Sequence, residues 1–141
     1  MLCVNTYSKQ YIAQTRSRVE AELTIHQRLR TAVNGKAQAD LDTLEPLWLN
    51  SLIVVLDRAF VHRTRAIEKK DGNPLNEVRM LCNSILENGG RLAADKTIKY
   101  DPAKSVLKLP IGHEIKLTAS AFQKLMDAFF SDLEAKFLAA S

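Results

Sequence analysis

The sequence predicts a mainly α-helical fold, a four-helix up-and-down bundle with a small β-hairpin inserted between its third and fourth helices. Two observations support this fold class. Four segments carry apolar residues at three- and four-residue spacing, and one short segment alternates apolar with polar residues. The 141 residues are 46% hydrophobic and 26% charged, a size and mixture typical of one domain, residues 1–141, with one core.

The first two predicted helices are the longest. Helix one covers about residues 8–33 and stops at Asn34-Gly35. Its inward stripe consists of Ile12, Val19, Leu23, His26, Leu29 and Val33. Helix two begins near Thr43, which can cap it, and runs to Asp71-Gly72. Its stripe consists of Leu49, Leu52, Ile53, Leu56, Phe60 and Ile67.

Helix two is apolar over more of its circumference than one stripe requires. Trp48 and Val55 lie away from the line of Leu49 and Leu56, so they need a cover that three other helices do not fully supply. This breadth predicts self-association, in the simplest case as a homodimer.

Helices three and four have clear start signals. Asn73-Pro74 predicts an N-cap followed by proline at the first helical position, and helix three stops at Asn88-Gly89-Gly90. Its inward residues are Leu75, Val78, Cys82 and Ile85. Thr118 caps helix four. The stripe of helix four consists of Phe122, Leu125, Met126, Phe129, Leu133 and Phe137.

Residues 97–117 break the helical pattern. Ile98 and Tyr100 alternate with polar residues, and Asp101-Pro102 is typical of a type I turn. Pro110-Ile111-Gly112 predicts a second turn. A small antiparallel hairpin is therefore expected here, packed on the helices because an isolated hairpin is only marginally stable.

The charge pattern limits the partners. The net charge is +4, and residues 57–70 and 91–116 each carry a surplus of +3. Such surpluses attract phosphate, but Tyr100 is the only aromatic residue in the second segment, so solvated faces are favoured over a nucleic-acid groove. The chain has no GxGxxG or GxxxxGK[ST] motif, so no nucleotide cofactor is expected.

Cysteine usage and hydropathy predict a location. Cys3 and Cys82 are too few for a disulfide framework or a four-cysteine zinc site and fit a reducing cytoplasm. The longest apolar block, Leu52 to Leu56, is far below the roughly 20 residues that span a bilayer. No membrane insertion is expected.

His26 is the first candidate for chemistry. At about 100° per residue it falls within the apolar stripe of helix one, so it needs a hydrogen-bond partner or a ligand. Di-metal bundles use inward glutamates with Glu-x-x-His, whereas Glu22 and His26 stand four apart and no second pair exists. A core or interface histidine is favoured, and a metal site with Glu22 and His26 is the alternative.

The end of helix two and the loop after it form the second candidate. Arg63 falls on the inward stripe and needs a carboxylate, and a turn near residue 71 brings Asn76 and Glu77 closest to it. The simpler interpretation is a structural Arg63–Glu77 pair. The alternative is a polar pocket for a small anionic ligand, with binding residues His62, Arg63, Asn73, Asn76 and Glu77.

Arg58 and His62 allow an enzyme hypothesis. At four-residue spacing on one helix face, the imidazole could accept a proton from a ribose 2′-hydroxyl while the guanidinium stabilises charge on the phosphate. The pair resembles the helical-bundle ribonucleases of the HEPN type, whose motif has four to six residues between Arg and His. Here only three residues intervene, which is short of that pattern. The resemblance implies metal-independent RNA cleavage.

A longer stretch, HRTRAIEKKDGNPLNEVRMLCNSILENGG with LTASAF and DAFF nearer the end, resembles an uncharacterised family of small bacterial helical proteins. The resemblance implies a stand-alone domain and no catalytic residues. The favoured function is a small, non-enzymatic cytoplasmic binding or interaction protein that self-associates.

Overall fold

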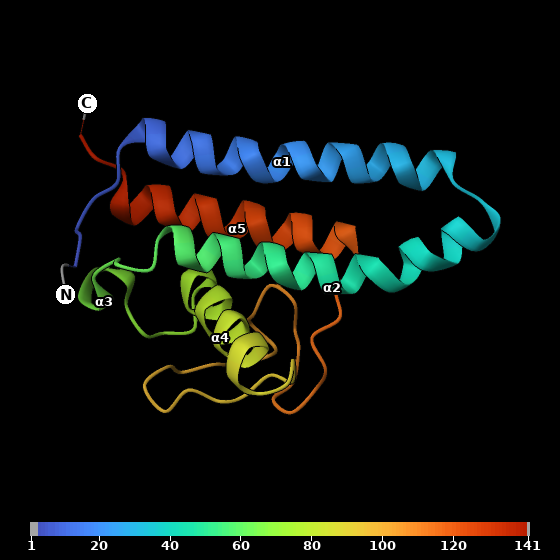
Figure 1. Cartoon of the computed structure of the whole chain (residues 1–141). Coiled ribbons are helices and arrows are strands. Elements are labelled where there is room, and N and C mark those ends of the chain that lie inside the picture. The colour runs from blue at the N-terminus through green and yellow to red at the C-terminus, as the bar shows by residue number, and fades with distance from the viewer. Residues whose placement is uncertain (1–2, 141) are drawn as a thin grey trace.

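The computed structural model describes residues 3–140 and is mainly helical, as predicted. Its helices are α1 (Lys9–Ala32), α2 (Gly35–Ala59), the short α3 (Arg65–Glu68), α4 (Pro74–Glu87) and α5 (Ala119–Phe137). The three long helices α1, α2 and α5 lie side by side, and α4 lies across α2 (Figure 1). The hairpin of α1 and α2 extends well past the first turn of α5 (Figure 1). The far end of this hairpin therefore lacks a third helix.

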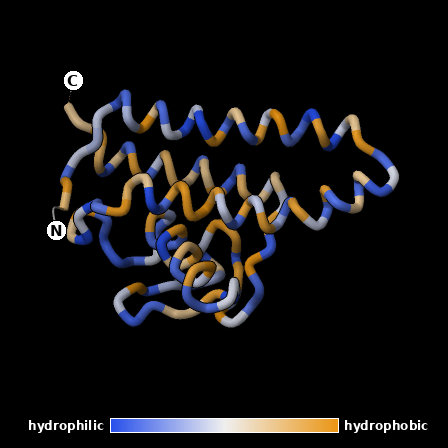
Figure 2. The backbone as a smooth tube through the Cα atoms, viewed as in Figure 1, coloured by the Kyte–Doolittle hydropathy of each residue, from blue (hydrophilic) through white to orange (hydrophobic). Residues whose placement is uncertain are grey.

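The core lies where α2, α4 and α5 meet. Phe60, at the end of α2, is fully buried and packs edge-to-face on Phe130 of α5, with ring centroids 6.1 Å apart. Hydrophobic positions are dense along α2 and α5 and recur between hydrophilic ones along α1 (Figure 2). The buried residues of α1 are Ile12, Val19 and His26. Most of the surface of α1 is therefore exposed to solvent.

Three predicted helix starts are confirmed by their caps. The side chains of Ser8, Asn73 and Thr118 each accept a hydrogen bond from a backbone N–H in the first turn of α1, α4 and α5. The predicted stripe of α5 is buried along its whole length. On α1 the stripe is only partly buried, because Leu29, expected to point inward, is 48% exposed.

The second helix differs from its prediction at both ends. It begins at Gly35, inside the predicted stop, and ends at Ala59 instead of continuing to Asp71. Thr43, predicted to cap it, lies within the helix and donates to Ala39 O. The chain after Phe60 turns because the N-terminal segment pairs with it: Val4 N–H donates to His62 O, and Val4 O accepts from Thr64 N–H. The short α3 then follows as a separate element.

The predicted β-hairpin at 97–117 is wrong. Within residues 3–140 the structure holds no sheet, and its three bridges are isolated. Side chains replace strand partners here: Glu77 accepts the backbone N–H groups of Val106 and Leu107, and Ser105 Oγ accepts that of Lys108. The segment is thus an irregular loop fastened to α4.

Candidate functional site

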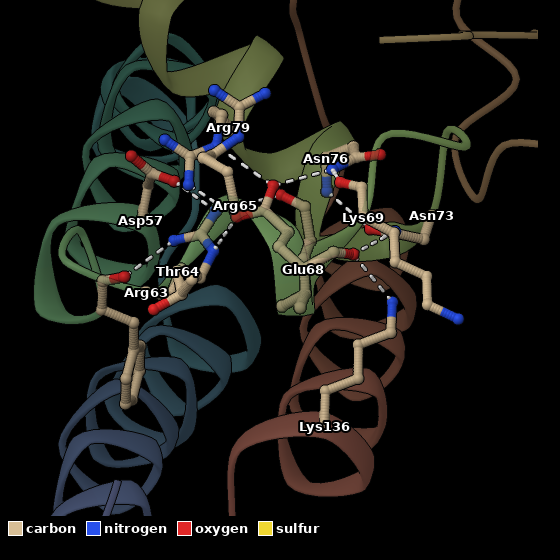
Figure 3. A network of polar contacts seen from close by, with 12 residues as sticks. Asp57, Arg63, Thr64, Arg65, Glu68, Lys69, Asn73, Asn76, Arg79 and Lys136 are labelled. Carbon is tan, nitrogen blue, oxygen red and sulfur yellow. Dashed lines mark hydrogen bonds and ion pairs between the residues drawn. The ribbon is translucent and has the colours of Figure 1, made fainter. Parts of the chain in front are cut away.

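Buried charges join α2, α3 and α4 at one end of the molecule. We call Asp57, Arg63, Glu68, Asn76 and Arg79 the Glu68 cluster (Figure 3). Arg63 lies 2.9 Å from Asp57 and 2.7 Å from Glu68, and its side chain is 0% exposed. Arg79 donates to both oxygens of Glu68 at 2.6 and 3.1 Å, and Asn76 donates at 2.7 Å. Two acids and two bases therefore balance one another, with Arg79 at the partly exposed edge of the cluster.

The ionised form of Glu68 is stabilised despite its burial. Burial alone would raise the pKa of this carboxyl, but hydrogen bonds from Arg79 and Asn76 and the positive charge of Arg63 outweigh it, so the pKa lies below its usual range. Glu68 thus carries its charge at neutral pH and holds both arginines in place.

The backbone of Glu68 is fixed as well. Its carbonyl accepts from Asn73 Nδ2 at 2.7 Å and from Lys136 Nζ at 3.1 Å (Figure 3). Lys136 also pairs with Asp132 on α5. Three helices, α2, α4 and α5, therefore converge on the one-turn helix α3. Such a densely connected polar network favours a single arrangement of its elements.

Glu77 has a different role from the one expected. It does not pair with Arg63, whose partners are Asp57 and Glu68; its two carboxylate oxygens accept the N–H groups of Val106 and Leu107 at 2.8 and 2.9 Å. Burial raises the pKa of Glu77, although these two hydrogen bonds oppose the change. Glu77 therefore fastens the loop to α4.

Replacing Glu77 with alanine is expected to destabilise the protein by about 2 to 4 kcal/mol, because two backbone donors lose their acceptor. Glu77→Gln should fall in between, since one amide oxygen replaces two acceptors. Urea denaturation measures the loss. Glu87→Ala, at an exposed position on the same helix, is the control and should change stability by less than about 0.5 kcal/mol. Equal effects of Glu77→Ala and Glu87→Ala would contradict this role.

The predicted anion-binding residues are only partly brought together. Asn73 and Asn76 lie next to Glu68, and Arg63 lies inside the cluster, whereas His62 is exposed in the turn after α2. The side chains of Arg63, Asn76 and Glu77 are buried and bound to partners within the chain. These contacts favour the structural interpretation of the region over a ligand pocket.

The Arg58–His62 pair does not share a helix face, because α2 ends at Ala59. Both side chains are exposed. RNA cleavage by Arg58 and His62 stays a prediction.

Cys82, which lies near Arg58, is buried, and burial raises the pKa of its thiol to about 11. The thiol therefore stays protonated at neutral pH.

The two basic segments of the sequence meet in the fold. Lys99 N–H donates to Lys70 O at 2.9 Å, and Arg65 donates to Thr97 Oγ1 at 3.2 Å. Lys69, also exposed, adds to this positive surface. These basic side chains come from α3 and from the segments that follow α3 and α4. That nucleic-acid binding is disfavoured stays a prediction.

His26 has partners inside the protein. It is 7% exposed, its Nε2 lies 3.1 Å from Glu45 Oε1, and its ring stacks on Trp48 with centroids 4.7 Å apart. Glu22 accepts the indole N–H of Trp48 at 3.1 Å. In the described part of the chain no three metal-ligating side chains come together. These contacts place His26 between α1 and α2, and its interpretation as a core or interface histidine stays a prediction.

An exposed apolar groove runs beside this histidine between α1 and α2. Its volume is about 200 Å³. It is lined by Glu22, Ile25, His26, Leu29, Leu41, Leu44, Glu45 and Trp48. Ile25, Leu29 and Leu44 are 54%, 48% and 56% exposed, which is unusual for large aliphatic side chains gathered in one place.

A second groove continues the first along the same two helices. It is lined by Tyr11, Gln14, Thr15, Arg18, Val54, Val55, Arg58 and Ala59. Most α1 residues of the two grooves belong to one row of four- and three-residue steps, which consists of Tyr11, Thr15, Arg18, Glu22, Ile25 and Leu29. Gln14 and His26 line the grooves beside this row. The matching row of α2 consists of Leu41, Leu44, Trp48, Ser51, Val55 and Arg58. We call these two rows together the α1–α2 face.

Between residues 3 and 140, no helix has the length and apolar character that crossing a membrane requires. Comparisons with protein-family models, curated proteins and solved structures find no match to this chain.

Proposed function

We propose that the protein is a small, non-enzymatic interaction module that self-associates through the α1–α2 face. The observation that carries the proposal is the exposed groove at Trp48, whose lining residues come from α1 and α2 alone. Trp48 and Val55, which the sequence indicated as needing a cover, both belong to this face and are only partly buried. Covering the face with a protein surface would remove apolar area from water.

The rest of the molecule supports a binding role over a catalytic one. The buried charges of the Glu68 cluster are paired with one another, and Glu77 is occupied by the loop. The exposed Cys3 and the buried Cys82 are both free thiols, which fits a reducing compartment such as the cytoplasm. The α1–α2 face is where large apolar side chains gather in the open.

Leu44→Glu tests the face. It places a charge in the groove, so we expect its self-association, measured by sedimentation equilibrium, to be at least about tenfold weaker than that of the wild type. The matched control is Leu86→Glu, since Leu86 of α4 is 51% exposed and outside the face. The control should associate like the wild type. A wild-type protein that remains strictly monomeric at high micromolar concentration would refute the proposal.

A further inference from the structure

We propose that the occupant of the α1–α2 face is a second copy of the chain, docked antiparallel, so that α1 lies on α1 of the partner subunit and α2 on α2. Arg18 of each protomer then faces Glu22 of the partner subunit, on both sides of a two-fold axis. This inference rests on the proposed function and adds the orientation and register of the partner.

The internal contacts of the hairpin fix how the two rows align. Tyr11 Oη donates to Ala59 O at 2.6 Å, and Trp48 Nε1 donates to Glu22 Oε1 at 3.1 Å. The two residue numbers in each pair add up to 70. From Tyr11 to Glu22, each α1 residue therefore lies beside the α2 residue whose number completes that sum. A position on α1 therefore has a defined neighbour on α2.

The spacing of both rows is symmetric. The α1 row steps by four, three, four, three and four residues, and its midpoint falls between Arg18 and Glu22. The α2 row steps by three, four, three, four and three, and its midpoint falls between Trp48 and Ser51. The two midpoints are level within half a residue, so one two-fold axis across the hairpin can serve both helices. Such seven-residue periodicity suits packing of helices along a seam.

Charge selects the antiparallel orientation. One half of the face carries Arg18 and Arg58, and the other half carries Glu22. Glu45 also lines that half but is already paired with Arg30. Parallel docking would place the basic halves together, whereas antiparallel docking places each basic half on an acidic half. The antiparallel register also sets Tyr11 against Leu29 of the partner subunit.

The size of the face is that of a reversible interface. At about 1.5 Å per residue, the row from Tyr11 to Leu29 is about 27 Å long, and two helices side by side are about 20 Å wide. This footprint lies at the low end of specific interfaces, the range of weak or transient association. The docked pair of hairpins would form an intermolecular four-helix arrangement.

Charge reversal at the axis tests the register. Arg18→Glu and Glu22→Arg should each weaken the homodimer about tenfold or more, because like charges then face each other twice. The double variant Arg18→Glu/Glu22→Arg should associate within about threefold of the wild type. An equimolar mixture of the two single variants should form heterodimers more tightly than either single variant associates with itself. Sedimentation equilibrium at low salt measures all four samples, and circular dichroism checks that each is folded.

Arg28→Glu, a reversal on the flank of α1 outside the face, is the control and should leave association unchanged. If the wild type associates and Leu44→Glu weakens it, but the mixture gains nothing over the single variants, the antiparallel register is overturned while the proposed function stands. If the wild type does not associate at all, both are overturned.

Discussion

Glu68→Gln is expected to destabilise the protein by about 3 to 5 kcal/mol, a large part of the stability of a domain of this size. The amide keeps the shape of the side chain but removes its charge. Arg63, with a side chain that is 0% exposed, would lose one of its two carboxylates, and Arg79 would lose its bidentate partner. Removing one member of a buried pair costs more than the pair contributes, because an uncompensated charge remains out of water. Chemical denaturation monitored by circular dichroism measures the change.

Glu134→Gln is the matched control, since Glu134 is exposed on α5, and it should be neutral within about 0.5 kcal/mol. The pH dependence gives a second readout. The folded pKa of Glu68 is depressed, so its contribution is complete above the unfolded value of about 4.3 and is lost as the pH falls through the folded pKa. The wild type should therefore lose stability on acidification more steeply than Glu68→Gln. Equal stability of Glu68→Gln and Glu134→Gln at pH 7 would show that the Glu68 cluster does not hold α2, α3 and α4 together.

The helix starts were predictable because their signals are local. Ser8, Asn73 and Thr118 each lie three residues before the N–H that they accept, so a short window of sequence contains the whole interaction. The end of α2 was not predictable in this way. Phe60 continues the apolar period, and what turns the chain is Val4, which pairs with residues 62 and 64 from a distant part of the sequence.

The β-hairpin at residues 97–117 was wrongly predicted for the same physical reason: its hydrogen-bond partner lies outside the segment. Alternating apolar residues predict a strand only if another strand supplies the hydrogen bonds. Here the partner is the Glu77 side chain, and Tyr100 donates to Leu109 O at the other end of the loop. Local alternation cannot show that a carboxylate from a preceding helix takes the place of a strand.

The candidate site was predicted in part. The sequence indicated that Arg63 needs a buried carboxylate. It did not indicate that Glu68 supplies one, because Glu68 lies between Ile67 and two lysines, a context typical of a solvated charge. Asp57 and Glu68 flank Arg63 in sequence, and only the end of α2 and the turn into α3 bring all three together. The breadth of apolarity at Trp48 did indicate the exposed face.

The α1 half of that face was not predicted, because Leu29 was assigned to the core. A helical stripe shows which residues share a side of a helix but not how far the neighbouring helix extends. Near His26 the first residues of α5 line a pocket, and the hairpin continues beyond them (Figure 1). Leu29 and Leu44 therefore remain exposed at the end of the hairpin. The length of the third helix decides this, and it is set by Thr118, far away in the sequence.

Gly72→Ala is expected to be the other severe substitution, with a loss of about 3 kcal/mol or more and a melting temperature lowered by about 10 °C. Gly72 has φ +88°, and a methyl group there would overlap the backbone carbonyl oxygen of Lys99. Relieving the overlap requires the chain to move where Lys99 N–H bonds Lys70 O and Gly72 N–H bonds Asn76 Oδ1. The substitution would thus separate the two basic segments and disturb the Glu68 cluster through Asn76.

Gly89→Ala is the control for Gly72→Ala, because it measures the cost of backbone strain without an atomic overlap. Gly89 has φ +63°, and no atom lies within 4 Å of the place where its Cβ would stand, so only the cost of a left-handed alanine, about 1 kcal/mol, is expected. Thermal unfolding of both variants followed by circular dichroism gives the comparison. Equal losses of stability in the Gly72 and Gly89 variants would mean that the loop carrying Lys99 moves aside at no cost. A much larger loss of stability at Gly72 would show that the contact between residues 70–72 and Lys99 is rigid and connects the loop to the Glu68 cluster.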